Sequence, residues 1–524
     1  MFKRLLLCLI VTGALFGSGL YAQKIAVPKS KEHKQAKTFF DTEEYLKSWQ
    51  LYKKILRSNS SDEFAAVYAA MSADRLNYAI DSSFFLLENL QKSGMDDAKY
   101  YLAKIKHKQK KFDEALSLLE MYTKVDPKKR LHSDEEANHL MNYCKNAKTL
   151  MAQPHSSVIK NMGKSINSAF DDYVPVIAPD ESELYFTSKR SGSTGNSKNG
   201  DNSYFEDVYV ARQENGEWKM AENIGYPINS SNNDACVAIS PDGHRMIVYR
   251  TAEDGISGDL YITEMGMHHR WEPLVLLGPE INSEFLEASA CFSRDTAELY
   301  FTSNRPGGYG GKDIYRIRKL PNGKWAAPFN LGPNVNTPFE EDAPFLHPDG
   351  VTLYFSSTGH NSMGEYDIFK SVWSAENNEF SKAENLGYPI NDVNSDIFFV
   401  LSADGQRGYY SSEKPETNGG IDLYQIDTRF GDNDLFVKQG YTYLGNTAAS
   451  VRITLIEKES NEEVGHYQSN PTTGKFVLVL NPMKAYHIIL EEDGYETIEE
   501  DLFPVVLEKS DEKLRYNLKK SNAK

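Results

Sequence analysis

The sequence predicts a multidomain protein in which all-α helical repeats precede a five-bladed β-propeller and a small β-sandwich. A unit of about 50 residues recurs five times in the middle of the chain, the segment before it has helical apolar spacing, and the segment after it alternates as strands do. The expected parts are a signal peptide at 1–22, a helical domain at 28–150, a propeller at 155–430 and a sandwich at 434–520.

The first residues of the chain have the composition of a cleaved secretory signal. Lys3 and Arg4 precede an apolar run at residues 5–16, and Ala22 stands before the polar Gln23. No later stretch comes near the roughly 20 apolar residues of a membrane span, so we expect no transmembrane segment in the mature chain. We therefore expect export to the periplasm with peripheral association to the outer membrane, or alternatively display on the cell surface.

The segment behind the signal is predicted to form helical hairpins. Ala103, Ala115 and Pro127 are spaced by twelve residues, and Ala36 and Ser48 repeat this step upstream. Small residues at these places let two antiparallel helices touch, and the proline closes the second helix. The pattern resembles a tetratricopeptide repeat, whose unit has small residues and proline at the same places. The resemblance implies two to three helical hairpins.

Two motifs mark each of the five units in the middle of the chain. The step Asp-x-Tyr/Phe recurs every 52 to 55 residues, at Asp207, Asp259, Asp313, Asp367 and Asp422. The step Gly-x-x-Ile/Val-Asn begins at Gly163, Gly225, Gly278, Gly332 and Gly387. Because residues that recur in every repeat usually serve the repeat itself, we interpret the five aspartates as structural.

The fourth unit shows how each repeat divides into strands. Apolar or β-branched runs occupy residues 343–347, 351–356 and 367–372, a Pro-Asp-Gly turn at 348–350 separates the first two, and Phe380 opens a fourth strand. Four strands in about 50 residues are typical of a propeller blade.

The two ends of the repeat array predict how the ring closes. The last unit stops after its third strand at residues 422–426, and the missing fourth strand is found in front of the array at residues 158–167. A last blade that is completed by the N-terminal strand joins the two ends and leaves no open sheet edge at that point.

Short motifs connect the repeats and the C-terminal segment to known families. The Pro-Asp-Gly turns at 241–243 and 348–350, the run LYFTSNR at 299–305 and the run DIY at 313–315 resemble the PD40 family, the TolB-like relatives of WD40 propellers. In the last segment, the runs GKF at 474–476 and GY at 494–495 carry a further resemblance. They are similar to the carboxypeptidase-regulatory-like domain, a small β-sandwich that is commonly an accessory module.

The order of the three parts suggests a function by resemblance. It looks like the OmpA-related periplasmic scaffolds of type IX secretion and gliding systems, and we expect the OmpA-like domain of those scaffolds to be lacking. The resemblance implies a non-catalytic scaffold that binds envelope or outer-membrane proteins. The alternative is a ligand-sensing or carbohydrate-binding propeller protein of the cell envelope.

One set of carboxylates is a candidate binding site. Seven residues before each Pro-Asp-Gly proline or its equivalent stands an acidic residue: Asp172, Asp234, Glu287, Glu341 and Asp396. These side chains could form a ring at one mouth of the propeller channel and bind a cation or a basic peptide. In the alternative interpretation, each carboxylate caps the local turn of its own blade.

Charge is divided unevenly along the sequence. Residues 24–155 have 23 Lys and Arg against 18 Asp and Glu, which gives +5; the signal adds +2, so residues 156–524 carry −23 of the total of −16. Nucleic acid is therefore not an expected partner. A basic patch in the helical segment is the candidate partner-binding surface: Lys104, Lys106, Lys108, Lys110 and Lys111. These lysines require an acidic surface, on the propeller or on another protein, to offset their repulsion.

The sequence gives no indication of catalytic chemistry. It contains no Gly-x-Ser-x-Gly elbow, and its twelve histidines do not cluster at the spacing of metal ligands. The three cysteines behind the signal, Cys144, Cys236 and Cys291, have no paired spacing and are interpreted as buried apolar residues. We predict that the chain is not an enzyme and has no catalytic residue, cofactor or metal.

Overall fold

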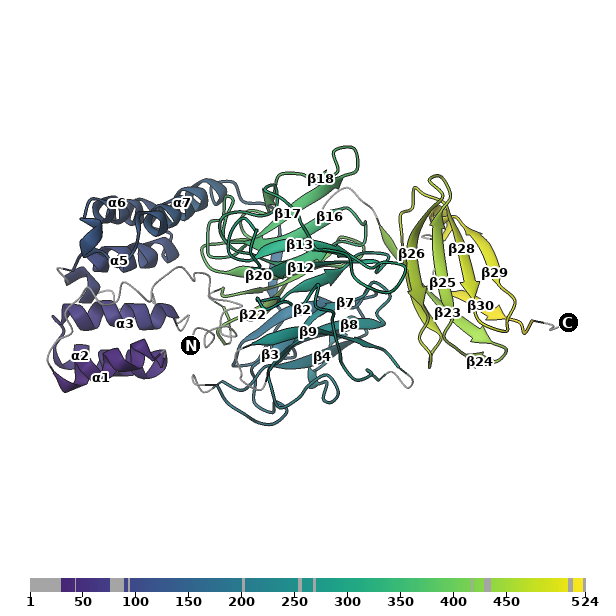
Figure 1. Ribbon diagram of the computed structural model, residues 1–524, viewed down its shortest axis with the longest axis horizontal. Coiled ribbons are helices and arrows are strands. Elements are labelled where there is room, and N and C mark those ends of the chain that lie inside the picture. The colour runs from purple at the N-terminus through teal and green to yellow at the C-terminus, as the bar shows by residue number, and fades with distance from the viewer. Residues whose placement is uncertain are drawn as a thin grey trace.

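The structure is a computed structural model that describes residues 30–42, 44–75, 89–92, 95–199, 203–252, 257–266, 270–414, 416–417, 419–427, 435–507 and 512–521. The predicted signal peptide at 1–22 lies outside these residues. Within the described ranges, no helix combines the length and the apolar character that crossing a membrane requires. Figure 1 shows the helices on one side of a large β-structure and a smaller β-structure on the other side.

The helical part consists of short helices, and helices that follow one another in the sequence pack against each other. The described helices are α1 (Lys31–Asp41), α2 (Tyr45–Ser58), α3 (Glu63–Arg75), α5 (Asp96–Lys108), α6 (Phe112–Thr123), the 3₁₀ turn Pro127–Lys129 and α7 (Asp134–Leu150). Ala103 of α5 and Ala115 of α6 are fully buried where these two helices meet. Ser133 and Glu136 form a capping box that fixes the start of α7.

The fold-class prediction is wrong in giving the chain an all-α tetratricopeptide-repeat domain. The described chain is mostly β, and no such repeat region is evident beyond this small N-terminal helical part. The twelve-residue step between small residues reflects only the close contact of two antiparallel helices, which many helix pairs make. In addition, α7 packs on the β-structure: Ala147 and Leu150 contact Met363 and Val393.

Five sheets form the large β-structure. Sheet one has β2 (Asp172–Ile177), β3 (Glu183–Ser188), β4 (Asp207–Glu214), β5 (Glu217–Trp218) and β6 (Glu222–Asn223), and sheet two has β7 (Asp234–Ile239), β8 (Arg245–Thr251), β9 (Gly258–Glu264) and β10 (Val275–Leu276). Sheet three has β11 (Ala290–Phe292), β12 (Glu298–Ser303), β13 (Asp313–Arg318) and β14 (Phe329–Asn330). Sheet four has β15 (Glu341–Leu346), β16 (Thr352–Ser357), β17 (Asp367–Ser374), β18 (Glu379–Phe380) and β19 (Glu384–Asn385). Sheet five has β20 (Asp396–Leu401), β21 (Arg407–Ser412), β22 (Asp422–Asp427) and β1 (Val158–Asn161).

These sheets are arranged as the blades of a propeller. The innermost strands β2, β7, β11, β15 and β20 each contact the next one, and β20 contacts β2, so the described strands close a ring. The predicted split blade is confirmed, because β1 pairs antiparallel with β22 between Val158 and Asp427 and between Asn161 and Tyr424. The ring is thus fastened by backbone hydrogen bonds between segments far apart in sequence.

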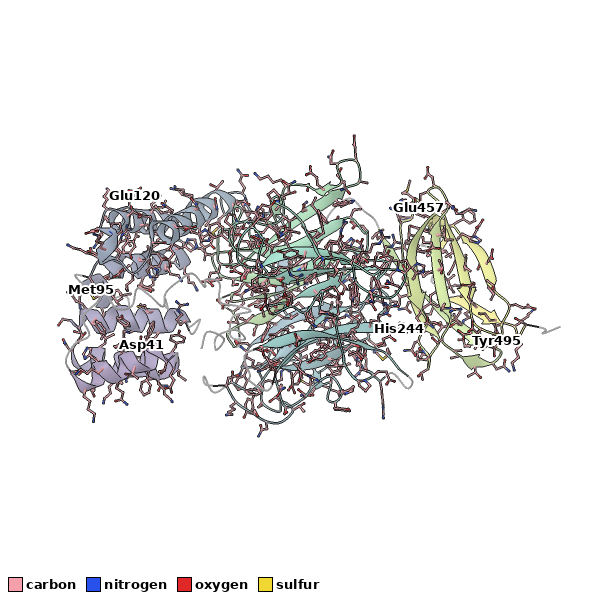
Figure 2. All side chains as sticks on the ribbon, viewed as in Figure 1. Asp41, Met95, Glu120, His244, Glu457 and Tyr495 are labelled. Carbon is pink, nitrogen blue, oxygen red and sulfur yellow. The ribbon has the colours of Figure 1, made fainter. Side chains whose placement is uncertain are left out.

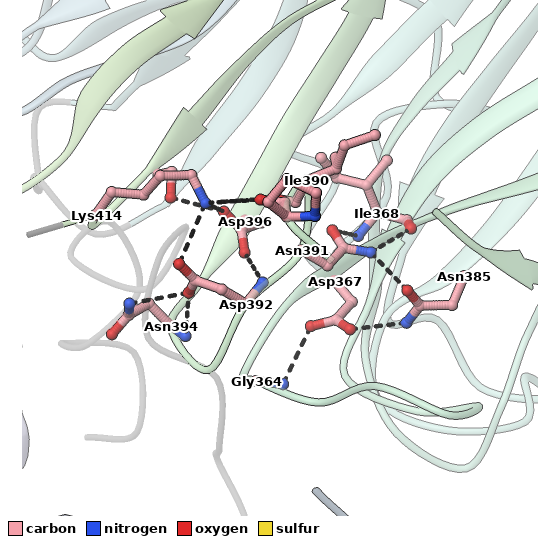
Figure 3. Close-up of polar contacts among 12 residues, drawn as sticks. Gly364, Asp367, Ile368, Asn385, Ile390, Asn391, Asp392, Asn394, Asp396 and Lys414 are labelled. Carbon is pink, nitrogen blue, oxygen red and sulfur yellow. Dashed lines mark hydrogen bonds and ion pairs between the residues drawn. The ribbon is translucent and has the colours of Figure 1, made fainter. Parts of the chain in front are cut away.

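The repeated polar motifs fasten the third and fourth strands of a blade. In blade 4, the Asn385 amide donates to the Asp367 carboxylate at 2.7 Å, and Asp367 also accepts from the backbone of Gly364 at 3.1 Å (Figure 3). Asn391, the last residue of the Gly-x-x-Ile-Asn step, bonds both the N–H and the carbonyl of Ile368 at 2.8 Å. The Asp-x-Phe aspartate is therefore structural in this blade, as the repeat pattern predicts.

Two four-stranded sheets form the C-terminal part. One contains β23 (Phe436–Leu444), β24 (Thr447–Ala448), β27 (Lys475–Leu480) and β30 (Leu514–Leu518); the other contains β25 (Arg452–Glu457), β26 (Glu462–Gln468), β28 (Tyr486–Glu491) and β29 (Ile498–Leu502), and the short helix α8 spans Pro504–Leu507. Buried apolar side chains from both sheets share one core. This part is called the sandwich below.

The sandwich is docked on the propeller through the turns between the first and second strands of the blades. Lys475 forms an ion pair with Asp180 in the turn of blade 1, and Arg294 in the turn of blade 3 donates to the carbonyl of Val479 at 2.9 Å. His244, in the corresponding turn of blade 2, lies on this sandwich-facing side of the propeller (Figure 2). The opposite face of the propeller carries the helical part.

Candidate functional site

The structure places all five predicted carboxylates inside the protein. Each is at most 2% exposed and accepts a hydrogen bond from the backbone N–H four residues before it. The distances are 2.5 Å for Ser168 to Asp172, 2.6 Å for Ser230 to Asp234, 2.9 Å for Ser283 to Glu287, and 2.7 Å for Thr337 to Glu341 and for Asp392 to Asp396. This arrangement fits the turn-capping interpretation, since solvent does not reach the carboxylates.

Four of these carboxylates have a basic partner. The pairs are Asp172 with Arg190 at 2.5 Å, Asp234 with Arg250, Glu287 with Arg305 at 3.2 Å, and Asp396 with Lys414 at 3.4 Å. Lys414 also binds Asp392 at 3.2 Å (Figure 3). Buried charges that are paired in this way hold a blade together but leave no open coordination position for an outside cation.

Glu341 of blade 4 is the exception among the described carboxylates of this set. Gly359 stands where blades 1, 3 and 5 have Arg190, Arg305 and Lys414. The hydroxyls of Thr337 and Ser357 each donate to Glu341 at 2.7 Å. A Cβ atom on Gly359 would lie 2.1 Å from the Thr337 hydroxyl oxygen, so no longer side chain fits there. Burial without a cation raises the pKa of Glu341 to about 8.

Three of the five lysines in the predicted basic patch face the propeller. Lys104 lies 3.8 Å from Glu365, and the ammonium of Lys110 lies 5.4 Å from the centre of the Tyr388 ring. Burial raises the pKa of Glu413 to about 8, and the charge of Lys108 opposes that rise. Lys104, Lys108 and Lys110 therefore lie near acidic or aromatic side chains of the propeller.

The two remaining lysines of the patch lie elsewhere. Lys106 pairs with Glu114 at 2.5 Å within the helical part, and Lys111 is exposed.

The central channel of the propeller is apolar and narrow. The innermost strands line it with small or apolar side chains, among them Ala235, Ala290 and Phe398, around a cavity of about 90 Å³. Val479 of the sandwich also borders this cavity and packs with Ala403 and Leu435 at the sandwich-facing mouth. The sandwich thus covers one mouth of the channel.

A second cavity is a crevice of about 560 Å³ between the propeller and the sandwich. Its lining comes from the turns of blade 1 (179–181) and blade 5 (402–407), from strand β23 with the residue before it (435–439), and from Leu507, Glu512 and Lys513. We call it the interdomain crevice. Its walls are fixed: Gln439 donates to Asp180 at 3.1 Å, and Arg407 donates to Glu181 at 2.9 Å.

Sequence reasoning did not find the interdomain crevice. Its walls come from two blade turns more than 200 residues apart and from the strand behind the propeller, and only the docking of the sandwich brings them together. The proline that stands at Pro179, Pro241 and Pro348 of the blade turns is replaced by Arg294 in blade 3 and by Ala403 in blade 5. Both replacements lie on the side on which the sandwich is bound, but neither by itself indicates a crevice.

The cysteines and histidines take structural positions where they are described. Cys144, Cys236 and Cys291 are buried and unbridged, and burial raises the pKa of the Cys144 thiol to about 12. Across the part of the chain that the structure describes, no group of three His, Cys, Asp or Glu side chains is placed to hold a metal ion. The adjacent pair His268 and His269 lies outside that part.

The ring of blades, the docked sandwich and the crevice between them define a β-propeller protein with an accessory β-sandwich. No protein-family model matches the chain. No curated protein matches it either.

Several similar solved structures are glycoside hydrolases. A thermostable family-43 glycoside hydrolase has 13% identity, a TM-score of 0.37, and 51% of this chain and 93% of that chain aligned. An endo-arabinase from Bacteroides thetaiotaomicron has 16% identity, a TM-score of 0.34, and 51% and 99% aligned. An alpha-L-arabinofuranosidase from Podospora anserina, in complex with cellotriose, has 12% identity, a TM-score of 0.34, and 51% and 92% aligned. At these identities the likeness concerns the fold alone.

The prediction that the chain is not an enzyme is corrected by these matches. It was based on the lack of a serine-hydrolase elbow and of clustered histidines, and the matching structures are glycoside hydrolases.

Proposed function

We propose that this chain is a ligand-binding β-propeller protein of the cell envelope and that its ligands are carbohydrates. The single observation that carries the proposal is the interdomain crevice. Its volume of about 560 Å³ lies within the range of about 300 to 1,000 Å³ that is usual for small-molecule sites. Domain interfaces are also a preferred location for such sites.

The lining of the crevice suits a neutral ligand that has many hydroxyl groups. Four acidic side chains (Asp180, Glu181, Asp404, Glu512) and three basic ones (Arg407, Lys438, Lys513) nearly balance in charge. Gln406 adds an exposed amide that can both donate and accept. A sugar hydroxyl also donates and accepts, so it can pair with Gln406 and with the exposed side chains of Glu512 and Lys513.

The crevice also offers an apolar surface for the faces of sugar rings. Pro179, Leu435, Phe436 and Leu507 line it beside the polar groups. Apolar walls with a few oriented polar groups are the general pattern of specific ligand sites. The central channel is a poorer candidate, because its cavity is about 90 Å³ and Val479 borders it at the sandwich-facing mouth.

A binding screen tests the proposal directly. The full chain is titrated calorimetrically with neutral oligosaccharides of two to six units and with uronic-acid oligosaccharides. We expect at least one neutral oligosaccharide to bind, and Gln406→Ala to weaken that binding about tenfold, which corresponds to about 1.4 kcal/mol. Gln50→Ala, an exposed glutamine on α2, is the matched control and should leave binding unchanged. Failure of every oligosaccharide to bind would reject the proposal.

A protein-binding scaffold of the envelope is the second candidate function. The observation that favours it is the extended shape: the helical part and the sandwich are docked on opposite faces of the propeller (Figure 1). Such a body can contact different proteins at its two ends. The sequence resemblance suggests envelope or outer-membrane proteins as partners, including those of a type IX secretion complex. Capture of a defined outer-membrane complex from solubilised envelope, lost when the helical part is deleted, would support this function.

Export is part of both proposals. Lys3, Arg4 and the apolar run behind them support secretion to the periplasm or the cell surface. Amino-terminal sequencing of the protein from a periplasmic or outer-membrane fraction is expected to begin near Gln23. Recovery from the cytoplasm of a chain that begins at Met1 would contradict export.

A further inference from the structure

The five blades allow an internal comparison of their outer edges. In the outermost strand of each blade, one position precedes the residue that faces the Asp-x-Tyr/Phe aspartate. This position is occupied by Lys160, Glu222 or Glu384 in three blades. Each of these forms an ion pair within its blade, at 2.6 Å to Asp427, 3.2 Å to Arg212 and 3.3 Å to Lys370 respectively. The equivalent residues of the neighbouring blades 2 and 3 are Val275 and Phe329, which are 62% and 57% exposed.

Blade 2 departs from the repeat at the next position as well. Four blades have an asparagine there that donates to the strand-three aspartate at 2.7 Å: Asn161, Asn223, Asn330 and Asn385. Blade 2 has Leu276, whose side chain is 53% exposed. Packing would explain a buried leucine at this position. Packing does not explain an exposed leucine that replaces a structural asparagine.

A basic hairpin of blade 3 adjoins this apolar strand. Trp325 lies against Gly278, two residues after Leu276: a Cβ atom on Gly278 would be 3.5 Å from the Trp325 ring. Lys319 pairs with Trp325 across the hairpin, and Lys324 precedes it. Arg318 lies directly opposite Glu298 in the β12–β13 pairing. Lys319 and Lys324 are exposed and form no ion pair among the described residues, although residues 156–524 carry a net charge of −23. We call Val275, Leu276, Arg318, Lys319 and Lys324 the rim patch.

The geometry points to a partner for the rim patch: we propose that it binds an extended segment of another protein in which apolar and acidic residues alternate. Strand β10 is the last strand of its sheet in the order β10-β9-β8-β7, so its outer backbone groups are available to a further strand. Val275 and Leu276 would contact the apolar residues of that segment. The exposed charges of Lys319 and Lys324 would attract its carboxylates. This inference is independent of the carbohydrate proposal.

A labelled peptide of the sequence DVEIDVEI tests the proposal by fluorescence polarisation with the full chain. The comparison peptide KVKIKVKI has the same apolar residues and lysine in place of each acidic residue. We expect the acidic peptide to bind at least tenfold more tightly at low salt, with an affinity that falls as salt is added. Lys319→Glu with Lys324→Glu should weaken it about tenfold and reduce the salt dependence.

Leu276→Asn is the decisive variant, because it restores the residue that the other four blades have. It should fold as the parent does, judged by its melting temperature, and bind the acidic peptide at least fivefold more weakly. Val372→Asn is the matched control, since it removes another exposed aliphatic side chain from blade 4, and it should bind within twofold of the parent. Equal binding of both peptides, or unchanged binding by Leu276→Asn, would overturn the proposal. A dimer of the parent chain that the Leu276→Asn substitution dissociates would also overturn the proposal, because a second copy of the chain would then cover the rim patch.

Discussion

The hydroxyl of Ser357 donates to the carboxylate of Glu341 at 2.7 Å in the blade that also carries the helical part. Ser357 begins the loop whose Thr358 and Ser362 carbonyls accept hydrogen bonds from α7. Glu341 therefore lies directly beneath the docking surface of the helices. Since Gly359 leaves it without a cation, its ionisation state affects the stability of this blade.

Glu341→Gln is expected to remove a pH dependence of stability. Burial raises the pKa of Glu341 from 4.5 to about 8, so the folded state prefers the neutral acid. Stability is then highest below about pH 4.5 and falls as pH rises toward 8, by up to about 1.4 kcal/mol per pH unit. The glutamine variant should lack this decline, because its amide can donate to the hydroxyls while its oxygen still accepts from the Thr337 N–H. Denaturant unfolding at pH 5, 7 and 9 measures the difference.

Glu287→Gln is the matched control for this prediction. It leaves the half-buried Arg305 guanidinium without its carboxylate partner and should destabilise the propeller by about 2 kcal/mol at pH 7. If both glutamine variants lose equal stability at pH 7, the carboxylate of Glu341 is ionised in the folded state and the assignment is wrong.

Tyr143→Phe is expected to loosen the helical part from the propeller. The Tyr143 hydroxyl donates to the Thr358 carbonyl at 2.9 Å, and its loss should cost about 1 kcal/mol of docking free energy. Limited proteolysis between residues 151 and 157 should accelerate about fivefold while the propeller stays intact. Tyr226→Phe, at a tyrosine that is 84% exposed, should leave the cleavage rate unchanged. Equal rates in both variants would show that this bond does not hold the helices.

Arg294→Ala is expected to release the sandwich. Arg294 is largely buried and donates to the Val479 carbonyl, so its removal leaves that group unpaired at the interface. The sandwich should then melt separately, and small-angle scattering should show a wider distribution of dimensions. Arg318→Ala, an exposed arginine of blade 3, should keep the parent profile. A single unchanged transition in Arg294→Ala would mean that the Lys475 ion pair suffices for docking.

Much of the propeller could be predicted from the sequence. Because the same motifs recur in five units, the strands identified in one blade also locate the strands of the other four. The step at Asp367 follows from the repeat spacing. The strand predicted at 158–167, which supplies the piece missing from the last unit, contains β1 and completes the split blade. The interpretation of the helical part as a series of repeats is wrong, because Ala103 and Ala115 indicate only the contact between α5 and α6. The crevice was missed because its walls depend on how Arg294 and Lys475 dock the sandwich, which no local pattern encodes.

Truncation tests the closure of the ring. A chain that begins at Phe170 lacks β1, which pairs with β22, and should lose the cooperative melt of the propeller. A chain that begins at Gln153 keeps β1 and should melt as the parent propeller does. Identical melting of the two shortened chains would mean that β1 contributes nothing to closure.

Hydrogen exchange in the presence of a bound oligosaccharide tests the central claim most directly. The parent chain is saturated with the tightest neutral oligosaccharide from the binding screen, and backbone exchange is followed by mass spectrometry. The interdomain crevice predicts added protection at residues 179–181, 402–407 and 435–439 and unchanged exchange at the helix-facing side of the propeller. Protection confined to the helix-facing side, with none in these three segments, would contradict the account.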